Sequence, residues 1–432
     1  MFSVAFYTLG CKVNRYESDA LAALFEAAGY SVVSPREMAD VYIINSCTVT
    51  GSGDKKSLQV LRRLSSKNPG AVIVLSGCLP QAFPDRAAEV LQADIITGTK
   101  NRAALVDMVS RRLEGKPPYR VVSIESHNPD DVFEEIWGVT ATERTRAFLK
   151  IQDGCGCGCT YCIIPRARGK VRSRPMDNLV FQLKRISELG IREVVLSGVN
   201  LGCYGMDLGL SLSHAIEAAC NTDGIERVRL GSVEPNVITP AEAYGWADFA
   251  DKLCGQFHLS LQSGADITLG RMGRRYTTED YCELVKVLRK VFPECSITTD
   301  IMVGFPGEDE DAHNQSLEFV EKIGFARTHI FSYSARPGTI AADMPGQVES
   351  KTKARRMAEM DKICTKSREE FLTSRLGKDL KVLVESCKDG ICFGHTSCFS
   401  PVYFLGYEES LGKVLGVRLT RLYKDGCWGE KV

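Results

Sequence analysis

The sequence predicts an α/β protein with an amino-terminal open parallel α/β sheet, a central partial β/α barrel and a small carboxyl-terminal all-β barrel. Short β-rich runs alternate with helix-length spacers in residues 1–115 and again in residues 141–373, which predicts the first two units. Residues 374–432 change to a period of two with glycine-containing turns, which predicts the third. Residues 116–140 contain prolines and a cluster of acids without periodicity, which is typical of a linker.

Strands of the first two units are expected where β-branched and other apolar residues run together. In the first unit, residues 16–28 predict a helix and the expected strands are 4–8, 41–45, 71–76 and 94–97. In the second, residues 350–374 predict one charged helix and the expected strands are 148–152, 193–197, 227–231, 257–261, 296–303 and 328–332. Strands separated by such spacers predict a full or partial β/α barrel.

Charge and cysteine content limit the classes of function. The 54 Lys and Arg residues balance the 54 Asp and Glu residues, so net charge gives no argument for a nucleic-acid partner. There are 17 cysteines and no secretion signal, so we expect reduced thiols or metal ligands rather than a disulfide framework. No run reaches the roughly 18 apolar residues that span a bilayer. The sequence therefore predicts a soluble cytoplasmic protein without a membrane partner.

Four cysteines lie within eight positions just beyond the first expected strand of the central barrel, where barrel enzymes carry active-site loops. Cys155, Cys159 and Cys162 have the spacing C-x3-C-x2-C. One loop with this spacing can ligate three corners of an iron–sulfur cubane and leave the fourth iron open, which is a catalytic feature. The alternative is a zinc site that uses Cys155 or Cys157 with Cys159 and Cys162.

This loop resembles the motif of the radical S-adenosylmethionine (SAM) superfamily. In that superfamily the open iron binds the amino and carboxylate groups of SAM, and an electron from the cluster cleaves SAM to a 5′-deoxyadenosyl radical. The resemblance implies that Cys155, Cys159 and Cys162 are catalytic as well as cluster ligands. It also implies that Tyr161 lies against the adenine of SAM.

Further candidate contacts to SAM lie at later strand ends, where small or polar residues face the same mouth of the barrel. The second strand end departs from the Gly-Gly-Glu patch that the superfamily often has there. Tight turns, which Gly and Ser favour, are the alternative explanation for all of these positions. The candidates are Ser197, Gly198 and Asn200 after the second strand, Ser232 and Glu234 after the third, and Gln262 after the fourth.

A second set of three cysteines lies in the amino-terminal unit. Cys11, Cys47 and Cys78 each follow the carboxyl end of an expected strand. Those ends form one rim of an open parallel sheet, so we expect the three thiols to converge. Inert packing is the alternative for any one of them, because cysteine is among the most buried residue types. Three ligands again indicate an iron–sulfur cluster with one open iron, which could hold sulfur.

Together these motifs resemble the methylthiotransferase family over nearly the whole chain. The matching segments are residues 8–14 (TLGCKVN), 45–50 (NSCTVT), 76–78 (SGC) and 153–165 (DGCGCGCTYCIIP). The first two forms resemble the MtaB-type branch, whose substrate is tRNA carrying N6-threonylcarbamoyladenosine at position 37. Other branches act on isopentenyladenosine in tRNA or on an aspartate of a ribosomal protein.

The resemblance implies an enzyme that attaches a methylthio group to carbon 2 of that adenine, with two 4Fe-4S clusters and SAM as cofactors. One SAM supplies the radical and another the methyl group, while the cluster on Cys11, Cys47 and Cys78 holds the sulfur to be transferred. The implied partners are the tRNA anticodon loop and a reductant such as flavodoxin or ferredoxin. The alternatives are a ribosomal-protein aspartate methylthiotransferase and a non-catalytic zinc-thiolate RNA-binding protein.

Several cysteines lie outside both triads. Cys157 is an extra thiol where family members usually have polar or aromatic residues. Its one-residue gaps to Cys155 and Cys159 are tight for simultaneous ligation, so we expect a spectator. In the carboxyl-terminal unit a zinc set is conceivable, but free or buried thiols are expected for Cys387, Cys392, Cys398 and Cys427.

Two features predict contact with RNA. The carboxyl-terminal barrel resembles a TRAM domain, a small RNA-binding module. A base of a single-stranded loop can also be splayed out of its stack and enter the mouth of the central barrel. Basic residues also flank the cluster loop and predict phosphate contacts, with a solvated charged surface as the alternative. They are Arg144, Arg146, Lys150, Arg166, Arg168, Lys170, Arg172 and Arg174.

Overall fold

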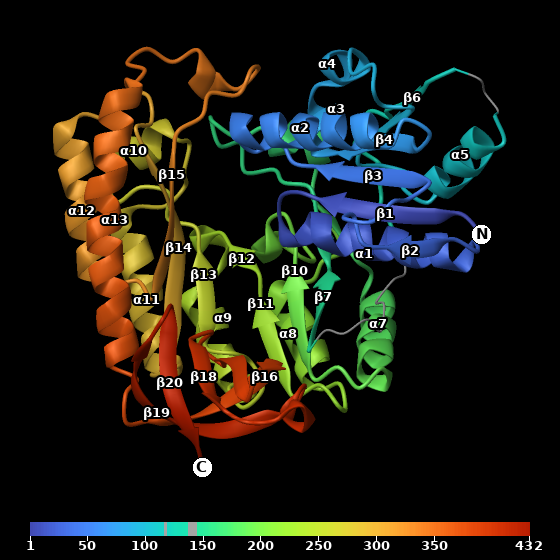
Figure 1. The fold of residues 1–432 in the computed structure, drawn as a ribbon. Coiled ribbons are helices and arrows are strands. Elements are labelled where there is room, and N and C mark those ends of the chain that lie inside the picture. The colour runs from blue at the N-terminus through green and yellow to red at the C-terminus, as the bar shows by residue number, and fades with distance from the viewer. Residues whose placement is uncertain (116–118, 137–144) are drawn as a thin grey trace.

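The computed structural model describes residues 1–115, 119–136 and 145–432. The amino-terminal sheet, the central strands and the carboxyl-terminal barrel follow one another along the chain, coloured from blue to red in Figure 1. The expected linker at residues 116–140 lies partly outside the described ranges. The three kinds of unit agree with the predicted α/β architecture.

The amino-terminal unit is a six-stranded parallel sheet in the order β2-β1-β3-β4-β5-β6. Its strands are β1 (Ser3–Thr8), β2 (Ser31–Val33), β3 (Val41–Ser46), β4 (Val72–Gly77), β5 (Ile95–Thr97) and β6 (Val121–Ser123). Its helices are α1 (Lys12–Ala27), α2 (Gly51–Lys67), α3 (Cys78–Ala82), α4 (Pro84–Ala88) and α5 (Ala104–Leu113). The sequence did not predict the edge strands β2 and β6, because each is only three residues long and partly exposed.

The central unit is an arc of two parallel sheets, β11-β10-β7 and β12-β13-β14-β15. The strands are β7 (Arg146–Lys150), β10 (Glu193–Ser197), β11 (Arg227–Leu230), β12 (Ser232–Val233), β13 (Gln256–Leu259), β14 (Ser296–Val303) and β15 (Arg327–Ser332). The strand expected at 227–231 ends at Leu230 as β11, which pairs with β10, and after Gly231 the short strand β12, which was not predicted, pairs with β13. The break at Gly231 joins the two sheets into one partial barrel.

Helices cover the outside of this arc and enclose the largest apolar core of the protein. They are α7 (Met176–Glu188), α8 (Leu212–Cys220), α9 (Pro240–Gly245), α10 (Asp266–Arg271), α11 (Thr278–Val291), α12 (Glu310–Ile323) and α13 (Ser350–Thr373). The loop after β7 carries β8 (Gln152–Asp153), α6 (Ile164–Arg168) and β9 (Arg172–Ser173). None of the helices in the described ranges is long and apolar enough to cross a membrane.

The carboxyl-terminal unit is a closed barrel in the order β16-β17-β18-β20-β19. Its strands are β16 (Asp379–Lys388), β17 (Ile391–Thr396), β18 (Pro401–Leu405), β19 (Val414–Tyr423) and β20 (Gly426–Lys431). Figure 1 shows it at the end of the central strands that lies away from the amino-terminal sheet. Arg227 and Arg229 of β11 donate hydrogen bonds to the Thr396 carbonyl, which fastens the barrel to that end.

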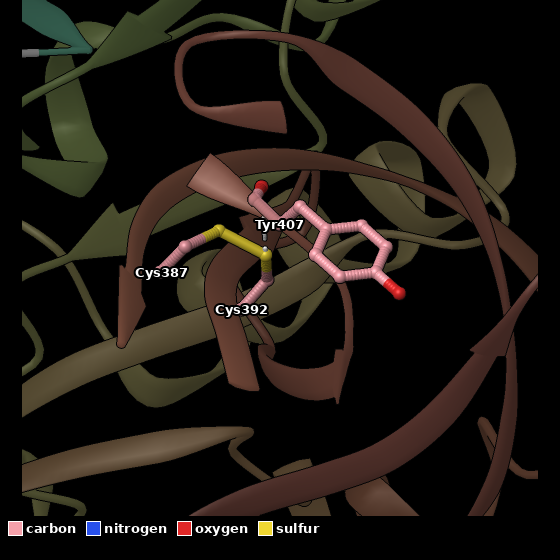
Figure 2. Close-up of a disulfide and its surroundings, with 3 residues drawn as sticks. All are labelled: Cys387, Cys392 and Tyr407. Atoms are coloured by element: carbon pink, nitrogen blue, oxygen red, sulfur yellow. Dashed lines mark hydrogen bonds between the residues drawn. A yellow bond between two sulfur atoms is a disulfide. The ribbon is translucent and has the colours of Figure 1, made fainter. Parts of the chain in front are cut away.

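A disulfide joins Cys387 and Cys392 within this barrel, with Tyr407 beside it (Figure 2). The expectation of free or buried thiols at these two positions is therefore wrong. Cys387 and Cys392 are direct partners in the antiparallel pairing of β16 with β17, which brings their side chains together across the hairpin. Cys398 and Cys427 are free and buried, as expected.

Candidate active site

The loop that carries Cys155, Cys159 and Cys162 runs from β8 to α6 at the carboxyl ends of the central strands. It begins at Gly154, whose φ is +74° and whose missing Cβ would lie 1.7 Å from the Lys170 carbonyl oxygen. Only glycine allows this close approach to the returning chain. Backbone hydrogen bonds from Cys155 to Gly169 (3.0 Å) and from Thr160 to Met272 (3.0 Å) hold the loop at the mouth of the barrel.

The other three cysteines lie at the ends of β1, β3 and β4, which are neighbours in the amino-terminal sheet. A Cβ on Gly10 would lie 2.8 Å from Cys47 Cβ, so the residue before Cys11 approaches Cys47 closely. Asn14 Oδ1 lies 3.7 Å from Cys11 Sγ and 3.9 Å from Cys78 Sγ. The rim of the sheet therefore gathers these thiols around Asn14.

Both triads line one cavity of about 400 Å³, which we call the cluster cavity. Ser197 is the one candidate site residue outside its lining, because its buried hydroxyl donates to the Val195 carbonyl of its own strand (3.1 Å). In the part of the chain that the structure describes, no three His, Cys, Asp or Glu side chains are arranged to hold a single metal ion. The candidate residues that line the cluster cavity are Cys11, Cys47, Cys78, Cys155, Cys159, Tyr161, Cys162, Gly198, Asn200, Ser232, Glu234 and Gln262.

The cluster cavity contains polar atoms that the protein itself does not satisfy. Asn200 Oδ1 and Gln262 Oε1 are buried and have no hydrogen-bond partner among the described residues. Gln262 adopts a left-handed backbone conformation with a φ of +68°, which is uncommon for a residue with a side chain. Buried polar atoms normally have partners, so these two fit a polar ligand such as SAM.

Burial is the largest influence on the pKa values of Cys78, Cys159 and Cys162. It raises the pKa of Cys78 to about 12 and that of Cys162 to about 12. Metal binding requires thiolates, so a nearby positive charge favours the ligated state. Arg168 acts on Cys78 in this way and Arg274 acts on Cys159.

Arg274 is a site residue that the sequence analysis missed. Its Nη1 lies 3.7 Å from Cys159 Sγ, and the same nitrogen forms an ion pair with Glu234. The guanidinium also lies 6.0 Å from the ring centre of Tyr161 and 5.6 Å from that of Tyr276. No recognised motif contains Arg274, since it follows α10 in a turn far from the cysteines in sequence.

Cys157 also lines the cluster cavity, and the Asn200 amide nitrogen lies 3.0 Å from its sulfur. A side-chain interaction with Cys155 lowers the pKa of Cys157, but Cys203 and burial outweigh it and raise that pKa to about 12. The spectator role expected for Cys157 therefore stays a prediction.

Four of the eight basic residues around the cluster loop are buried, so the expectation that they contact phosphates is wrong for these four. Lys150, Arg168, Arg172 and Arg174 are buried, and the first two form ion pairs with Glu17 of α1. Arg146 pairs with Glu193 and Glu385, Arg144 lies outside the described residues, and Arg166 and Lys170 remain exposed. The sequence shows these basic residues as a run of charges, but it does not show that the amino-terminal unit packs over part of that run.

This buried network joins the amino-terminal sheet to the barrel. Arg168 donates to Asn14 Oδ1 (2.7 Å) and to both oxygens of Glu17, while Lys150 Nζ lies 2.7 Å from Glu17 Oε1. Burial alone would raise the pKa of Glu17, but Arg102, Arg168 and Lys150 lower it to about 2. Because Asn14 also contacts Cys11 and Cys78, the network positions the second triad against the barrel mouth.

Comparison with known proteins identifies the family. Residues 3–98 match the model of uncharacterized protein family UPF0004, and residues 149–320 match that of the radical SAM superfamily. The threonylcarbamoyladenosine tRNA methylthiotransferase MtaB of Bacillus subtilis (strain 168) is 36% identical over 436 residues, covering 99% of this chain and 96% of the relative. This chain belongs to the methylthiotransferase family. It is therefore a radical SAM enzyme, with SAM and 4Fe-4S clusters as cofactors.

Another family member acts on a different nucleoside according to its name. The tRNA-2-methylthio-N(6)-dimethylallyladenosine synthase of Pelotomaculum thermopropionicum (strain DSM 13744 / JCM 10971 / SI) is 34% identical over 422 residues, covering 95% of this chain and 93% of the relative. Among solved structures, the radical SAM methyltransferase TsrM from Kitasatospora setae, with cobalamin and a [4Fe-4S] cluster bound, aligns with a TM-score of 0.57. It is 14% identical and the match covers 79% of this chain and 77% of TsrM, which supports the fold alone.

Proposed function

We propose that this methylthiotransferase transfers a methylthio group to C2 of N6-threonylcarbamoyladenosine at position 37 of tRNA, forming ms2t6A. The observation that carries the proposal is the cluster cavity, because two cysteine triads from different domains line one space. Relatives that carry this activity in their names match nearly the whole chain. We also place the enzyme in the cytoplasm, together with its tRNA.

Each triad has a separate task in this proposal. Cys155, Cys159 and Cys162 would hold the cluster that binds SAM, and the other three cysteines would hold the cluster that carries the sulfur. When bound, these groups supply the radical that abstracts the hydrogen atom from C2 and the sulfur that takes its place. The chain's own polar atoms, among them Asn200 Oδ1 and Gln262 Oε1, would orient SAM, and the aromatic ring of Tyr161 would lie against its adenine.

The carboxyl-terminal barrel offers a surface for RNA that the sequence analysis did not identify. Tyr403 and Tyr423 have ring centres 5.2 Å apart, and Tyr423 and Trp428 are likewise 5.2 Å apart. Exposed Arg421 and Lys424 lie over these rings. We call these five residues the barrel patch. Aromatic rings that stack on bases, next to cations that contact phosphates, are typical of single-stranded RNA recognition.

The proposal is tested by nucleoside analysis of tRNA. The chain is expressed in a bacterial strain that makes t6A but lacks its own methylthiotransferases, and the digested tRNA is analysed by mass spectrometry. We expect ms2t6A with the native chain and unmodified t6A with the Cys159→Ala variant. Formation of the methylthio derivative of dimethylallyladenosine instead, or modification of a ribosomal protein with unchanged tRNA, would contradict the assigned substrate.

The same preparation decides whether the site holds clusters. An anaerobically purified chain with a reductant of the flavodoxin or ferredoxin class is expected to cleave SAM. Stoichiometric zinc without SAM cleavage would support the non-catalytic RNA-binding alternative.

A further inference from the structure

A second cavity, of about 570 Å³, lies inside the arc of central strands, and we call it the inner cavity. It adjoins the cluster cavity, because both are lined by Cys11, Gly198, Ser232 and Asp300. At its other end lies Phe399 of the carboxyl-terminal barrel, with the Arg229 guanidinium 4.7 Å from its ring centre. The inner cavity thus extends from the site of chemistry into the core of the barrel.

Positive charge dominates the lining of the inner cavity. Its cations are Lys12, Arg146, Arg229 and Arg327, and its one acidic lining residue among the described residues is Asp300. Three of these five charged groups already have a polar partner within the protein. Arg146 and Arg229 lie 2.8 and 3.2 Å from the buried carboxylate of Glu193, and Asp300 lies 3.2 Å from His258 Nε2.

Lys12 and Arg327 are different. Neither forms an ion pair or a side-chain hydrogen bond with any residue in the described ranges, and both are accessible to solvent. Lys12 lies within electrostatic range of Arg229, Arg146 and Asp300, and His329 lies within range of both Lys12 and Arg327. The two uncompensated cations therefore come from facing elements, the start of α1 and the strand β15, and act on the same space.

The chemistry of the proposed substrate determines which part of it would reach this space. The glycosidic nitrogen of adenine lies on the side of the base opposite the Watson–Crick edge, which carries N6, N1 and C2. Because the sugar-phosphate chain of a flipped base stays at the protein surface, the Watson–Crick edge points inward. With C2 between the two triads, the N6 substituent lies beside it and is directed deeper into the protein.

We propose that Lys12 and Arg327 form the subsite that binds the carboxylate of the threonylcarbamoyl group on N6. This inference rests on the proposed function and adds its specificity-determining residues. A carboxylate satisfies two cations that lack a partner, and charge-assisted hydrogen bonds of this kind are the strong ones. A dimethylallyl group has no charge, so the same cavity would leave both cations desolvated and unpaired around it, which disfavours that substrate.

The test compares two anticodon stem-loop RNAs that differ in one group. One carries t6A with its free carboxylate and the other carries the methyl ester of t6A. Dissociation constants for the reconstituted enzyme are measured by fluorescence anisotropy, and methylthiolation of each RNA is measured by mass spectrometry. We expect the native chain to bind the free acid about tenfold to hundredfold more tightly than the ester. The Arg327→Gln variant should lose most of this preference by binding the acid more weakly.

Two further variants sharpen the result. Lys12→Gln should also reduce the preference, and its iron content reports whether the neighbouring Cys11 still ligates. Arg192→Gln is the matched control, because Arg192 pairs with Glu226 on the exposed surface and should keep the full preference.

The outcomes separate the two proposals. If the native chain modifies the acid and the ester equally well, or if Arg327→Gln keeps the preference, the carboxylate subsite is wrong while the proposed function stands. If the native chain modifies neither RNA, the proposed function fails. If Arg327→Gln instead abolishes SAM cleavage in the absence of RNA, the residue serves SAM and the subsite is again overturned.

Discussion

At the scale of single residues, Arg274 links three components of the site. It contacts the sulfur of Cys159, a proposed cluster ligand, pairs with Glu234 and lies over the ring of Tyr161. Residues that donate to a metal ligand tune the potential of the metal centre and are costly to lose. We therefore expect Arg274 to be a positioning residue that acts through Cys159 on the cluster proposed there.

Replacing Arg274 with Gln should lower the rate of SAM cleavage about tenfold or more, with the iron content unchanged. The physical reason is the loss of a positive charge and of a donor to the Cys159 sulfur, which makes reduction of the cluster harder. A redox titration followed by electron paramagnetic resonance should show a more negative midpoint potential. The exposed neighbour Arg275 is the matched control, and a similar shift in Arg275→Gln would contradict this role.

The two triads should be separable by iron analysis. The native chain should hold about eight irons after anaerobic reconstitution, and a variant with Cys11, Cys47 and Cys78 all changed to Ala should hold about four. That variant should still cleave SAM but should form no methylthio product. Cys157→Ala should keep about eight irons, and a loss of four would show that this thiol is a ligand rather than a spectator.

At the scale of elements, helix α1 joins two domains through Glu17. Its carboxylate is buried among Arg102, Arg168 and Lys150, of which the last two belong to the barrel. Removing one partner of a buried ion network leaves the other charges buried without a partner. The protein then loses more free energy of unfolding than the ion pairs contributed. Glu17 is therefore one acid that holds the sheet against the barrel, and Asp54, which pairs with Arg336, is another.

Glu17→Gln should lower the free energy of unfolding by about 3–5 kcal/mol, measured by urea denaturation. Asp379→Asn is the control, because Asp379 pairs with Arg418 on the exposed surface, where water screens the pair, and should change stability far less. Equal decreases in the free energy of unfolding of the two variants would show that the buried Glu17 network stabilises the protein no more than an exposed ion pair does.

The same carboxylate predicts a dependence of stability on pH. Its pKa in the folded protein is about 2, below its ordinary value of 4.5, so folding favours the charged form. The stabilisation is fully present above pH 4.5 and is lost as the pH falls toward 2. The free energy of unfolding should decrease over this interval in the native chain and decrease less in Glu17→Gln. Parallel curves would exclude Glu17 as a source of the acid sensitivity.

The barrel patch predicts the strength of RNA binding. Tyr423 lies between Tyr403 and Trp428, so its loss disrupts the whole aromatic platform. Tyr423→Ala should weaken binding of unmodified tRNA about tenfold, since each base stacked on an aromatic ring contributes about 1–3 kcal/mol. Tyr244 of α9 is also an exposed tyrosine, and Tyr244→Ala should bind as the native chain does. Equal affinities for both variants would place the RNA elsewhere.

At the scale of the whole molecule, local patterns predicted the architecture and the placement of the six cysteines at strand ends, while their role as cluster ligands stays a prediction. Strands such as 193–197 and 296–303 have the predicted bounds, because they are buried on both faces and leave a continuous apolar signal. The cysteines of the first triad are close in sequence, and those of the second follow neighbouring parallel strands. Both arrangements can be inferred without knowing how the domains dock.

Features that depend on docking could not be predicted in this way. Arg168 and Lys150 look like surface residues in sequence but are buried by α1, and Arg274 reaches Cys159 from a distant turn. The pairing of Cys387 with Cys392 depends on the register of one hairpin, which the sequence pattern alone leaves open. Likewise, the sequence does not show that Lys12 and Arg327 line the same cavity, because this depends on how α1 is placed against β15.

The buried network also orders events during synthesis of the protein. Glu17 leaves the ribosome 151 residues before its partner Arg168, and Arg168 is the cation that acts on Cys78. A nascent chain that ends before the cluster loop therefore has its amino-terminal thiols but lacks the positive charge beside them. We therefore expect the cluster proposed for that triad to form only after the central barrel has been made.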